Sequence, residues 1–176
     1  MLFLTKKLGV GILTTAEKKG LLREAHVKLA AAQMMQLNKV GEVLGKLPGV
    51  SAMTDVTGFG LLGHLAEMAE GSGLSAEVDF ENIQTIIDDL EFYIDNKSIP
   101  GGTHRNWDSY GEKIGPITDY QKAILADPQT SGGLLIAVAP SSVDEVKNIL
   151  RQAGLANMLS PIGTITLKKQ QVVSVK

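Results

Sequence analysis

Strand-like and helix-like apolar patterns alternate along this chain, and glycine or proline separates most of them. The clearest segment is 134–138, a continuous apolar run that follows a Gly-Gly pair and is typical of a strand buried on both faces. Residues 50–56 and 75–80 also have strand character, with helix-forming spacing between them. Because such strands need helices to cover them, the sequence predicts an α+β fold in which helices cover a mixed β-sheet.

The individual elements are predicted from the period of the apolar residues, which is two in strands and 3.6 in helices. We expect strands at 2–15, 50–56, 75–80, 134–138, 162–167 and 172–175. We expect helices at 21–35, 40–47, 61–69, 83–94, 118–126 and 143–153. Residues 97–116 are rich in glycine and proline and are expected to form a long loop. The last two strands are expected to pair as an antiparallel hairpin through residues 168–170.

Composition excludes several classes of protein. The 176 residues include 17 Lys and Arg against 19 Asp and Glu, so the formal charge of −2 offers no basic field for a nucleic acid. The absence of cysteine excludes disulfides, cysteine-ligated zinc and a cysteine nucleophile within these residues. No apolar run approaches the roughly 20 residues of a membrane-spanning helix, and the start lacks the order of a secretory signal. We therefore expect one cytoplasmic domain, residues 1–176, with no membrane or nucleic-acid partner.

The glycine turn at 57–60 is the first candidate site. Gly58, Gly60 and Gly63 match the pattern G-x-G-x-x-G between a predicted strand and a predicted helix. Asp79 stands near the end of the next strand, as the acidic residue does in dinucleotide-binding βαβ units. The residues before the glycines are polar for the core of such a strand, and no further parallel strand-helix units follow, so this remains the weaker hypothesis.

Asp55 supports a different hypothesis for the same turn. A carboxylate at the carboxyl end of a strand, beside a glycine turn that opens a helix, is suited to Mg²⁺ and polyphosphate. Asp55 would hold the metal, and the backbone N–H groups of Gly58 and Gly60 would bind phosphate oxygens. Thr57 would add a hydroxyl group. The alternative is that Asp55 and Thr57 only cap the helix, which helix starts commonly require.

Two other polar segments are candidate sites. Residues 100–106 bring a His, an Arg and an Asn together beside two glycines, a composition that suits an anion but also an ordinary surface turn. Residues 127–133 form a polar turn before a buried strand. This turn either presents residues 129–131 to a ligand or simply reverses the chain.

Three stretches taken together resemble one family, selenophosphate synthetase (selenide, water dikinase). They are AMTDVTGFGLLGHL at 52–65, PGGTHRN at 100–106 and DPQTSGGLL at 127–135. The opening LTKKLG at 4–9 is also similar, except that Lys7 stands where the family usually has Pro. That difference should alter local stiffness rather than chemistry.

The resemblance implies that the chain is the carboxyl-terminal half of an enzyme that converts selenide, ATP and water to selenophosphate, AMP and phosphate. The implied fold is that of the carboxyl-terminal domain of aminoimidazole ribonucleotide synthetase and its relatives. A missing amino-terminal half would supply the catalytic Cys or selenocysteine, an essential Lys, most ATP and Mg²⁺ ligands, and most of a homodimer interface. Residues 2–5 read as a strand already in progress, which is also expected of a fragment.

For individual residues, the resemblance implies one Mg²⁺ ligand, Asp55, and no catalytic residue within this chain. The candidates for contact with ATP are Thr57, Gly58, Gly60, Arg105 and Asn106. Two alternatives stay open. One is another member of the superfamily, such as an ATP-dependent amidine-forming enzyme or a small-molecule kinase. The other is a non-catalytic binding or oligomerisation domain.

Overall fold

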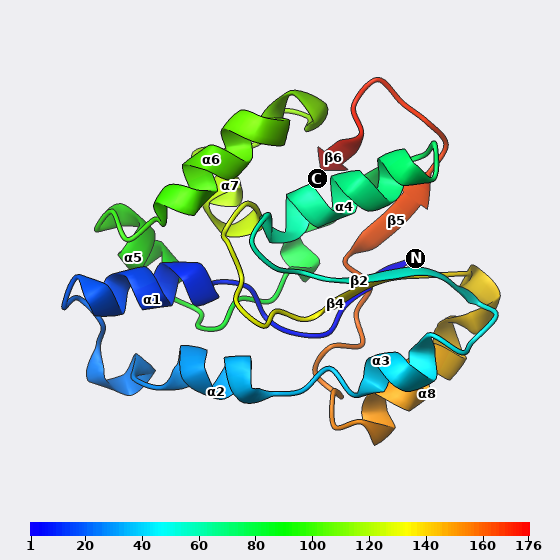
Figure 1. Cartoon of the computed structure of the whole chain (residues 1–176), viewed down its shortest axis with the longest axis horizontal. Helices are drawn as coiled ribbons and strands as arrows, with labels where there is room; N and C mark the ends of the chain where they lie inside the picture. Colours follow the sequence, from blue (N-terminus) through cyan, green and yellow to red (C-terminus); the bar gives the residue numbers. More distant parts are fainter.

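A computed structural model describes residues 1–176 and contains one six-stranded sheet with helices packed around it (Figure 1). The strands are β1 (Leu2–Leu4), β2 (Val50–Asp55), β3 (Ser75–Val78), β4 (Leu134–Val138), β5 (Gly163–Thr166) and β6 (Val173–Val175). They lie in the order β2-β4-β1-β5-β3-β6, and only β3 and β6 pair in parallel. The predicted α+β fold with a mixed sheet is confirmed.

The helices vary in length and surround the sheet. They are α1 (Val10–Lys18), α2 (Leu29–Met35), α3 (Val40–Leu44), α4 (Gly60–Gly71), α5 (Leu90–Asp95), α6 (Gly101–Tyr110), α7 (Asp119–Leu125) and α8 (Val143–Gln152). Short 3₁₀ turns occur at Glu24–His26, Phe80–Asn82, Gly111–Lys113 and Pro140–Ser142. None of these helices is long and apolar enough to cross a membrane.

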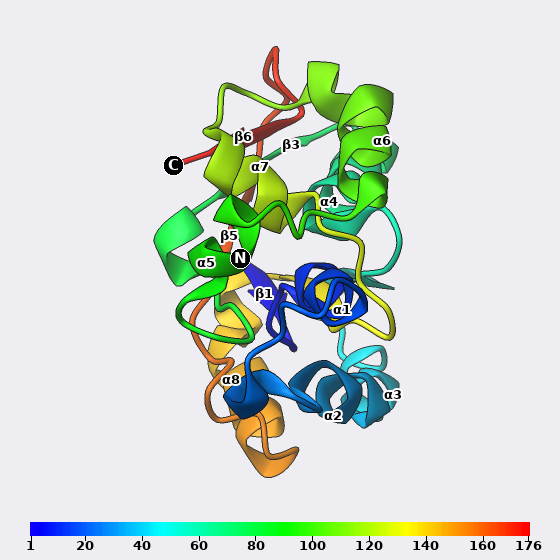
Figure 2. The ribbon, with the colours of Figure 1, turned by 90° about the vertical axis from the view of Figure 1, so that its left-hand side faces the viewer.

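Strand β4 is buried along its whole length because both of its faces are covered. Leu135 and Ala137 belong to the main hydrophobic core. The alternating residues Leu134, Ile136 and Val138, together with Phe3 of β1, belong to a second core formed with α3 and α8. Figure 2 shows α3 and α8 on one side of the sheet and α1, α4 and α7 on the other. The continuous apolar run of β4 therefore reflects burial on two faces, as predicted.

The prediction of one strand over 2–15 is wrong beyond Leu4. Gly9 has φ 113°, and the chain turns there into helix α1. Val10, Leu13 and Ala16 are buried at three-residue spacing on the inner face of α1. The apolar alternation over residues 8–12 resembled a strand, but the same residues also fit a helix, and short windows do not separate the two periods.

Two further predictions are corrected in the middle of the chain. The helix expected at 83–94 is present only as α5, because residues 84–86 instead hydrogen-bond the extended segment at Leu8, with Leu8 N–H to Gln84 O at 2.9 Å. The long loop expected at 97–116 contains helix α6. The buried residues of α6 include Thr103 and Asn106, so its inner face is largely polar and the sequence lacks the apolar spacing that predicts a helix.

The remaining helix predictions are confirmed with changed bounds. The helix expected at 21–35 begins only at Leu29, after a 3₁₀ turn. Helices α3, α4, α7 and α8 lie within or close to their expected ranges. A Thr118 capping box begins α7, where Gln121 N–H donates to Thr118 Oγ1 and Gln121 Oε1 accepts from Thr118 N–H.

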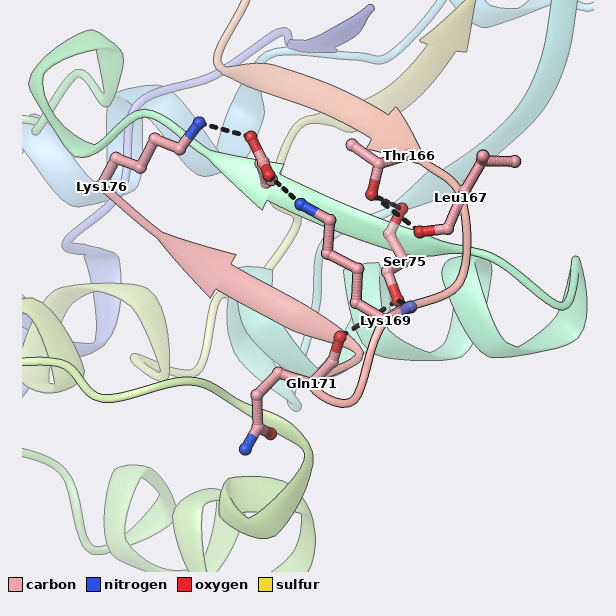
Figure 3. Close-up of polar contacts among 7 residues, drawn as sticks. Ser75, Thr166, Leu167, Lys169, Gln171 and Lys176 are labelled. Atoms are coloured by element: carbon pink, nitrogen blue, oxygen red, sulfur yellow. Dashed lines mark hydrogen bonds and ion pairs between the residues drawn. The ribbon is translucent and has the colours of Figure 1, made fainter.

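Strands β5 and β6 do not form the expected hairpin, because β3 lies between them and pairs with both. Figure 3 shows how the connecting segment crosses the start of β3. Ser75 Oγ accepts from Lys169 N–H at 2.9 Å and donates to Gln171 O at 3.0 Å. Glu77 forms ion pairs with both Lys169 and Lys176. These long-range contacts, which local sequence does not reveal, replace the hairpin pairing.

The Glu77 ion pairs predict a dependence of stability on acid pH. Hydrogen bonds from Lys169 and Lys176 lower the pKa of Glu77 from 4.5 to about 2. Because the folded state favours the carboxylate, this contribution is present above pH 4.5 and is lost as the pH falls towards 2. We expect Glu77→Gln to lower the urea midpoint at pH 6 and to lose less stability than the parent between pH 4.5 and 2.

Glu81→Gln is the matched control, since Glu81 is exposed and makes no ion pair. It should follow the parent over the whole pH range. The effect of Glu77→Gln should shrink in 1 M NaCl, because salt screens exposed charges. Equal acid profiles for parent and Glu77→Gln would show that these ion pairs contribute nothing to stability.

Candidate functional site

The glycine turn joins the edge strand β2 to helix α4 and lies at one edge of the sheet (Figure 1). Asp55 is the last residue of β2 and pairs with Leu134 of β4 in antiparallel register. The next strand, β3, lies four positions away in the sheet, on the far side of β4, β1 and β5. A dinucleotide-binding βαβ unit requires adjacent parallel strands, so that hypothesis is wrong for this turn.

The glycines of the turn have different surroundings. Gly60 has φ +69°, and a Cβ atom there would lie 2.8 Å from the carbonyl carbon of Ala126. Gly63 faces the ring of Tyr110 in the same close way, so both glycines allow helices to approach. Gly58 is exposed, and a Cβ atom there would meet nothing within 4 Å. Packing therefore explains Gly60 and Gly63, whereas Gly58 leaves open space beside the backbone.

Backbone donors are available at this open point. The N–H groups of Thr57, Gly58 and Phe59 donate no hydrogen bond within the chain, whereas Gly60 N–H donates to Thr57 O at 3.0 Å. Successive free N–H groups ahead of a helix can bind an oxyanion, and α4 has 12 residues to support that end with its dipole. The turn is thus suited to a phosphate group.

Two distant segments hold the turn in place. Asn106 of α6 is buried and donates from Nδ2 to Gly58 O at 2.8 Å and to Ala126 O at 3.0 Å. From the 127–133 turn, Gln129 N–H donates to Thr57 O at 3.0 Å. Both amide hydrogens of Asn106 are therefore engaged by the chain itself. Asn106 positions the glycine turn, and only its side-chain oxygen is available to a ligand.

Asp55 has a free carboxylate. It is exposed and makes no hydrogen bond or ion pair through its side chain. Helix α4 has Phe59 at its N-cap and no side-chain cap, so the alternative that Asp55 and Thr57 cap this helix is wrong. Thr57 Oγ1 instead lies 3.1 Å from His64 Nε2, a contact that holds the turn against the largely buried His64.

Within the chain, Asp55 has no partners for a complete metal site. No group of three His, Cys, Asp or Glu side chains converges anywhere in the structure. Mg²⁺ requires near-octahedral oxygen coordination, which one carboxylate cannot provide. The residues present fit one ligand of a metal whose remaining ligands come from phosphate, water or another part of a larger protein.

The structure separates Arg105 from the other predicted site residues. Thr57, Gly58, Gly60 and Asn106 are joined by contacts around one turn. Arg105 precedes Asn106 on α6, is exposed and makes no ion pair. His104 is exposed as well. Arg105 is therefore a free cation on the helix that braces the turn.

Asp127 begins the candidate turn at 127–133, and its burial was not predicted from the sequence. It is fully buried, and its Oδ2 accepts from Gly11 N–H at 3.0 Å and from Gln129 Nε2 at 2.8 Å. Its Oδ1 has no partner. Burial raises the pKa of Asp127 to about 7, against the opposing effect of its N–H donors. The signal in the sequence was the polar DPQTSGG turn directly before a fully apolar strand.

Comparison with known proteins gives a consistent family match. The family described as AIR synthase related protein, C-terminal domain, matches residues 1–176. A selenide, water dikinase of Aeromonas hydrophila is 55% identical over 164 residues, which cover 93% of this chain and 47% of that protein. One from Pasteurella multocida is 60% identical over 148 residues, which cover 84% of this chain and 42% of that protein. The chain spans about half the length of the curated relatives it matches.

Solved structures share the fold at low sequence identity. A thiamine-monophosphate kinase from Stenotrophomonas maltophilia has a TM-score of 0.66 at 17% identity, covering 99% of this chain and 49% of the kinase. The hydrogenase maturation protein HypE, solved in complex with ATP, has a TM-score of 0.64 at 16% identity. That match covers 99% of this chain and 46% of HypE. At this identity the likeness concerns the fold alone.

The raised pKa of Asp127 predicts that neutral pH destabilises the chain relative to mildly acid pH. The folded state holds the proton up to about pH 7, whereas the unfolded carboxyl releases it near 3.8. Stability should therefore fall as the pH rises from about 4 to 7, by an amount on the order of a few kcal/mol. We expect Asp127→Asn to flatten this part of the profile, measured by thermal or urea unfolding. A parent protein with stability rising over that range would contradict it.

The surroundings of the two turn glycines predict opposite outcomes for the same substitution. Gly60→Ala places a side chain at positive φ and against the Ala126 backbone, so it should cost at least about 2 kcal/mol. Gly58→Ala enters open space and should change stability by less than about 0.5 kcal/mol. Urea unfolding of both variants at neutral pH tests this. Equal losses would mean that Gly58 is also required by packing.

Proposed function

The chain belongs to the AIR synthase related protein, C-terminal domain, family, and from that premise we propose that it is the carboxyl-terminal domain of an ATP-dependent selenophosphate synthetase. The whole enzyme would convert selenide, ATP and water to selenophosphate, AMP and phosphate. The selenide, water dikinases at 55% and 60% identity support this substrate. Because the chain spans about half their length, the remaining half of the machinery would belong to an amino-terminal domain.

The observation that carries the site is the unpartnered Asp55 carboxylate at the end of β2, beside the open backbone of Gly58. In this proposal Asp55 provides one Mg²⁺ ligand. Mg²⁺ would offset the charge that develops during phosphoryl transfer. The free N–H groups at Gly58 and Phe59 would bind phosphate oxygens, and Gly58 would let the ligand approach the backbone closely.

The other candidate residues support this arrangement in different ways. Thr57 and Asn106 fix the shape of the turn through His64 and the Gly58 carbonyl. Gly60 allows α4 to begin against Ala126. Arg105, an exposed cation on α6, would add positive charge for a phosphate group that reaches this helix. None of these side chains performs bond-making chemistry, so the chemical groups would come from the amino-terminal domain.

The proposal also covers the compartment, the oligomeric state and the small-molecule partners of the whole enzyme. We expect a cytoplasmic enzyme that acts as a homodimer, with ATP and selenide as its small-molecule partners. The chain alone should bind ATP weakly and form no AMP, because one carboxylate does not hold a catalytic Mg²⁺ in competition with water.

A second candidate is an ATP-dependent kinase or amidine-forming enzyme with another substrate. The shared fold of the thiamine-monophosphate kinase favours it, although 17% identity supports only the fold. A third candidate, a binding or oligomerisation domain without catalysis, is separated from both by the absence of ATP consumption in the complete protein.

Asp55→Asn tests the proposal in a protein that contains this chain together with its amino-terminal domain. We expect selenide-dependent AMP formation under anaerobic conditions to fall by at least about 100-fold, because a metal ligand is lost while size and exposure are kept. The unfolding midpoint should not change. Asp88→Asn, at an exposed aspartate without a side-chain partner, is the matched control and should retain activity.

Activity that survives in Asp55→Asn would keep the family and remove Asp55 from the metal site. No selenide-dependent AMP in the parent, with ATP consumed in the presence of another acceptor, would favour the second candidate. AMP formation by residues 1–176 alone would contradict the division of the machinery between two domains.

A further inference from the structure

A cavity with a volume of about 680 Å³ is lined by residues outside the glycine turn. Its walls come from the segment after β1, from the connection between α2 and α3, and from the segment after α8. Figure 1 shows these helices at the lower side of the sheet. The lining includes Lys6, Lys7 and Lys39 and no Asp or Glu. The cavity is therefore positively charged without an internal counter-charge.

Lys6 is the central cation of this cavity. It is only 5% exposed, and its Nζ donates to Gln36 O at 2.7 Å and to Ser131 O at 2.6 Å. No carboxylate lies within ion-pair distance of it. An ammonium group has three N–H donors, so one remains for another acceptor. Burial lowers the pKa of Lys6, and a bound anion would oppose that shift.

The walls of the cavity are fixed by hydrogen bonds that do not use the lysine charges. Gln33 Nε2 donates to Lys7 O at 2.8 Å, and Asn38 Nδ2 donates to Gly132 O at 2.9 Å. These contacts join α2 and the following connection to the ends of β1 and β4. The amino groups of Lys7 and Lys39 make no hydrogen bond or ion pair. The cavity is thus preformed, with its positive groups available.

The cavity is distinct from the Asp55 site, although both lie at the carboxyl ends of their strands, β1 and β2. Asp55 pairs with Leu134, and Thr5 bonds Leu134 from the other side, with Thr5 N–H to Leu134 O at 3.1 Å. Asp55 and Thr5 are therefore two strand spacings apart, or about 10 Å. Asp55 does not line the cavity, and it forms no ion pair with Lys6, Lys7 or Lys39.

We propose that this cavity is a second anion site, which binds a phosphate group through Lys6, Lys7 and Lys39. Multiply charged oxyanions match three ammonium groups without a carboxylate, and a buried unpaired cation gains most from such a ligand. The volume exceeds what a single phosphate fills and falls within the range of small-molecule sites, so the phosphate would be carried on a larger molecule or a polyphosphate.

Titration of the 176-residue chain with inorganic phosphate, pyrophosphate and AMP tests this, with amide chemical shifts as the readout. We expect saturable shifts at residues 5–7, 36–39 and 131–132 with all three ligands, and tighter binding of pyrophosphate than of phosphate. Chloride at equal ionic strength should produce no saturable shift there. Preference for AMP or pyrophosphate over phosphate distinguishes an ester or polyphosphate ligand from the free ion.

Two lysine variants test the residues. Lys7→Gln and Lys39→Gln should each weaken pyrophosphate binding about fivefold, which corresponds to about 1 kcal/mol, and the double variant should weaken it more than tenfold. Lys18→Gln, at an exposed lysine on α1, is the control and should bind like the parent. Lys6 is avoided as the first variant because its two backbone hydrogen bonds also support the fold.

The position of the shifts separates this inference from the proposed enzyme activity. Residues 55–60 lie outside the cavity lining, so a ligand bound only at the glycine turn would shift residues 56–60 and not residues 5–7, 36–39 and 131–132. No saturable binding by the parent, shifts confined to residues 56–60, or unchanged affinity in the double lysine variant would each overturn the proposal. None of these results would depend on whether the complete protein uses selenide.

Discussion

The turn at 127–133 holds three separate parts of the chain together through its own polar groups. Asp127 and Gln129 accept the N–H groups of Gly11 and Val10 at the start of α1. Gln129 N–H binds the glycine turn at Thr57, and Ser131 O accepts from Lys6. Strand β4 begins directly after this turn and contributes residues to both hydrophobic cores, so its packing holds the turn in place. Contacts from this turn therefore position both the glycine turn beside Asp55 and the lysine cavity.

Sequence patterns predicted the elements whose signals are local. The apolar run of β4, the glycine-ended helix α4 and the capping box of α7 each depend on residues within the element or beside it. Helix α1 was missed because its first N–H groups are capped by residues more than 100 positions away. Helix α6 was missed because polar residues, Thr103 and Asn106, occupy its buried face. In both, tertiary contacts determine the structure where the local pattern is ambiguous.

In the candidate site, too, the sequence predicted some features, whereas tertiary contacts determine the others. The resemblance and the strand-end position both indicated Asp55, and the structure gives that carboxylate a position without internal partners. The spacing of Gly58, Gly60 and Gly63 did not reveal their roles, because two of them serve helix packing and only one leaves open space. Asn106 was expected near a ligand, but its amide hydrogens bind the backbone of the turn. A sequence motif therefore identifies candidate site residues, and the tertiary contacts show which of their groups are free to bind a ligand.

The last consequence of this arrangement is that unlike charges stay unpaired at the carboxyl ends of β1 and β2. Strand β4 lies between β2, which ends at Asp55, and β1, which leads to Lys6, and the free carboxylate forms no ion pair with the free ammonium groups of the cavity. Had Lys6 reached Asp55, an ion pair would have satisfied both groups and left no net charge for a ligand. Because β4 keeps them apart, the carboxylate remains available to a cation and the lysines to an anion. The central buried strand therefore stabilises the fold and also preserves two sites of opposite charge.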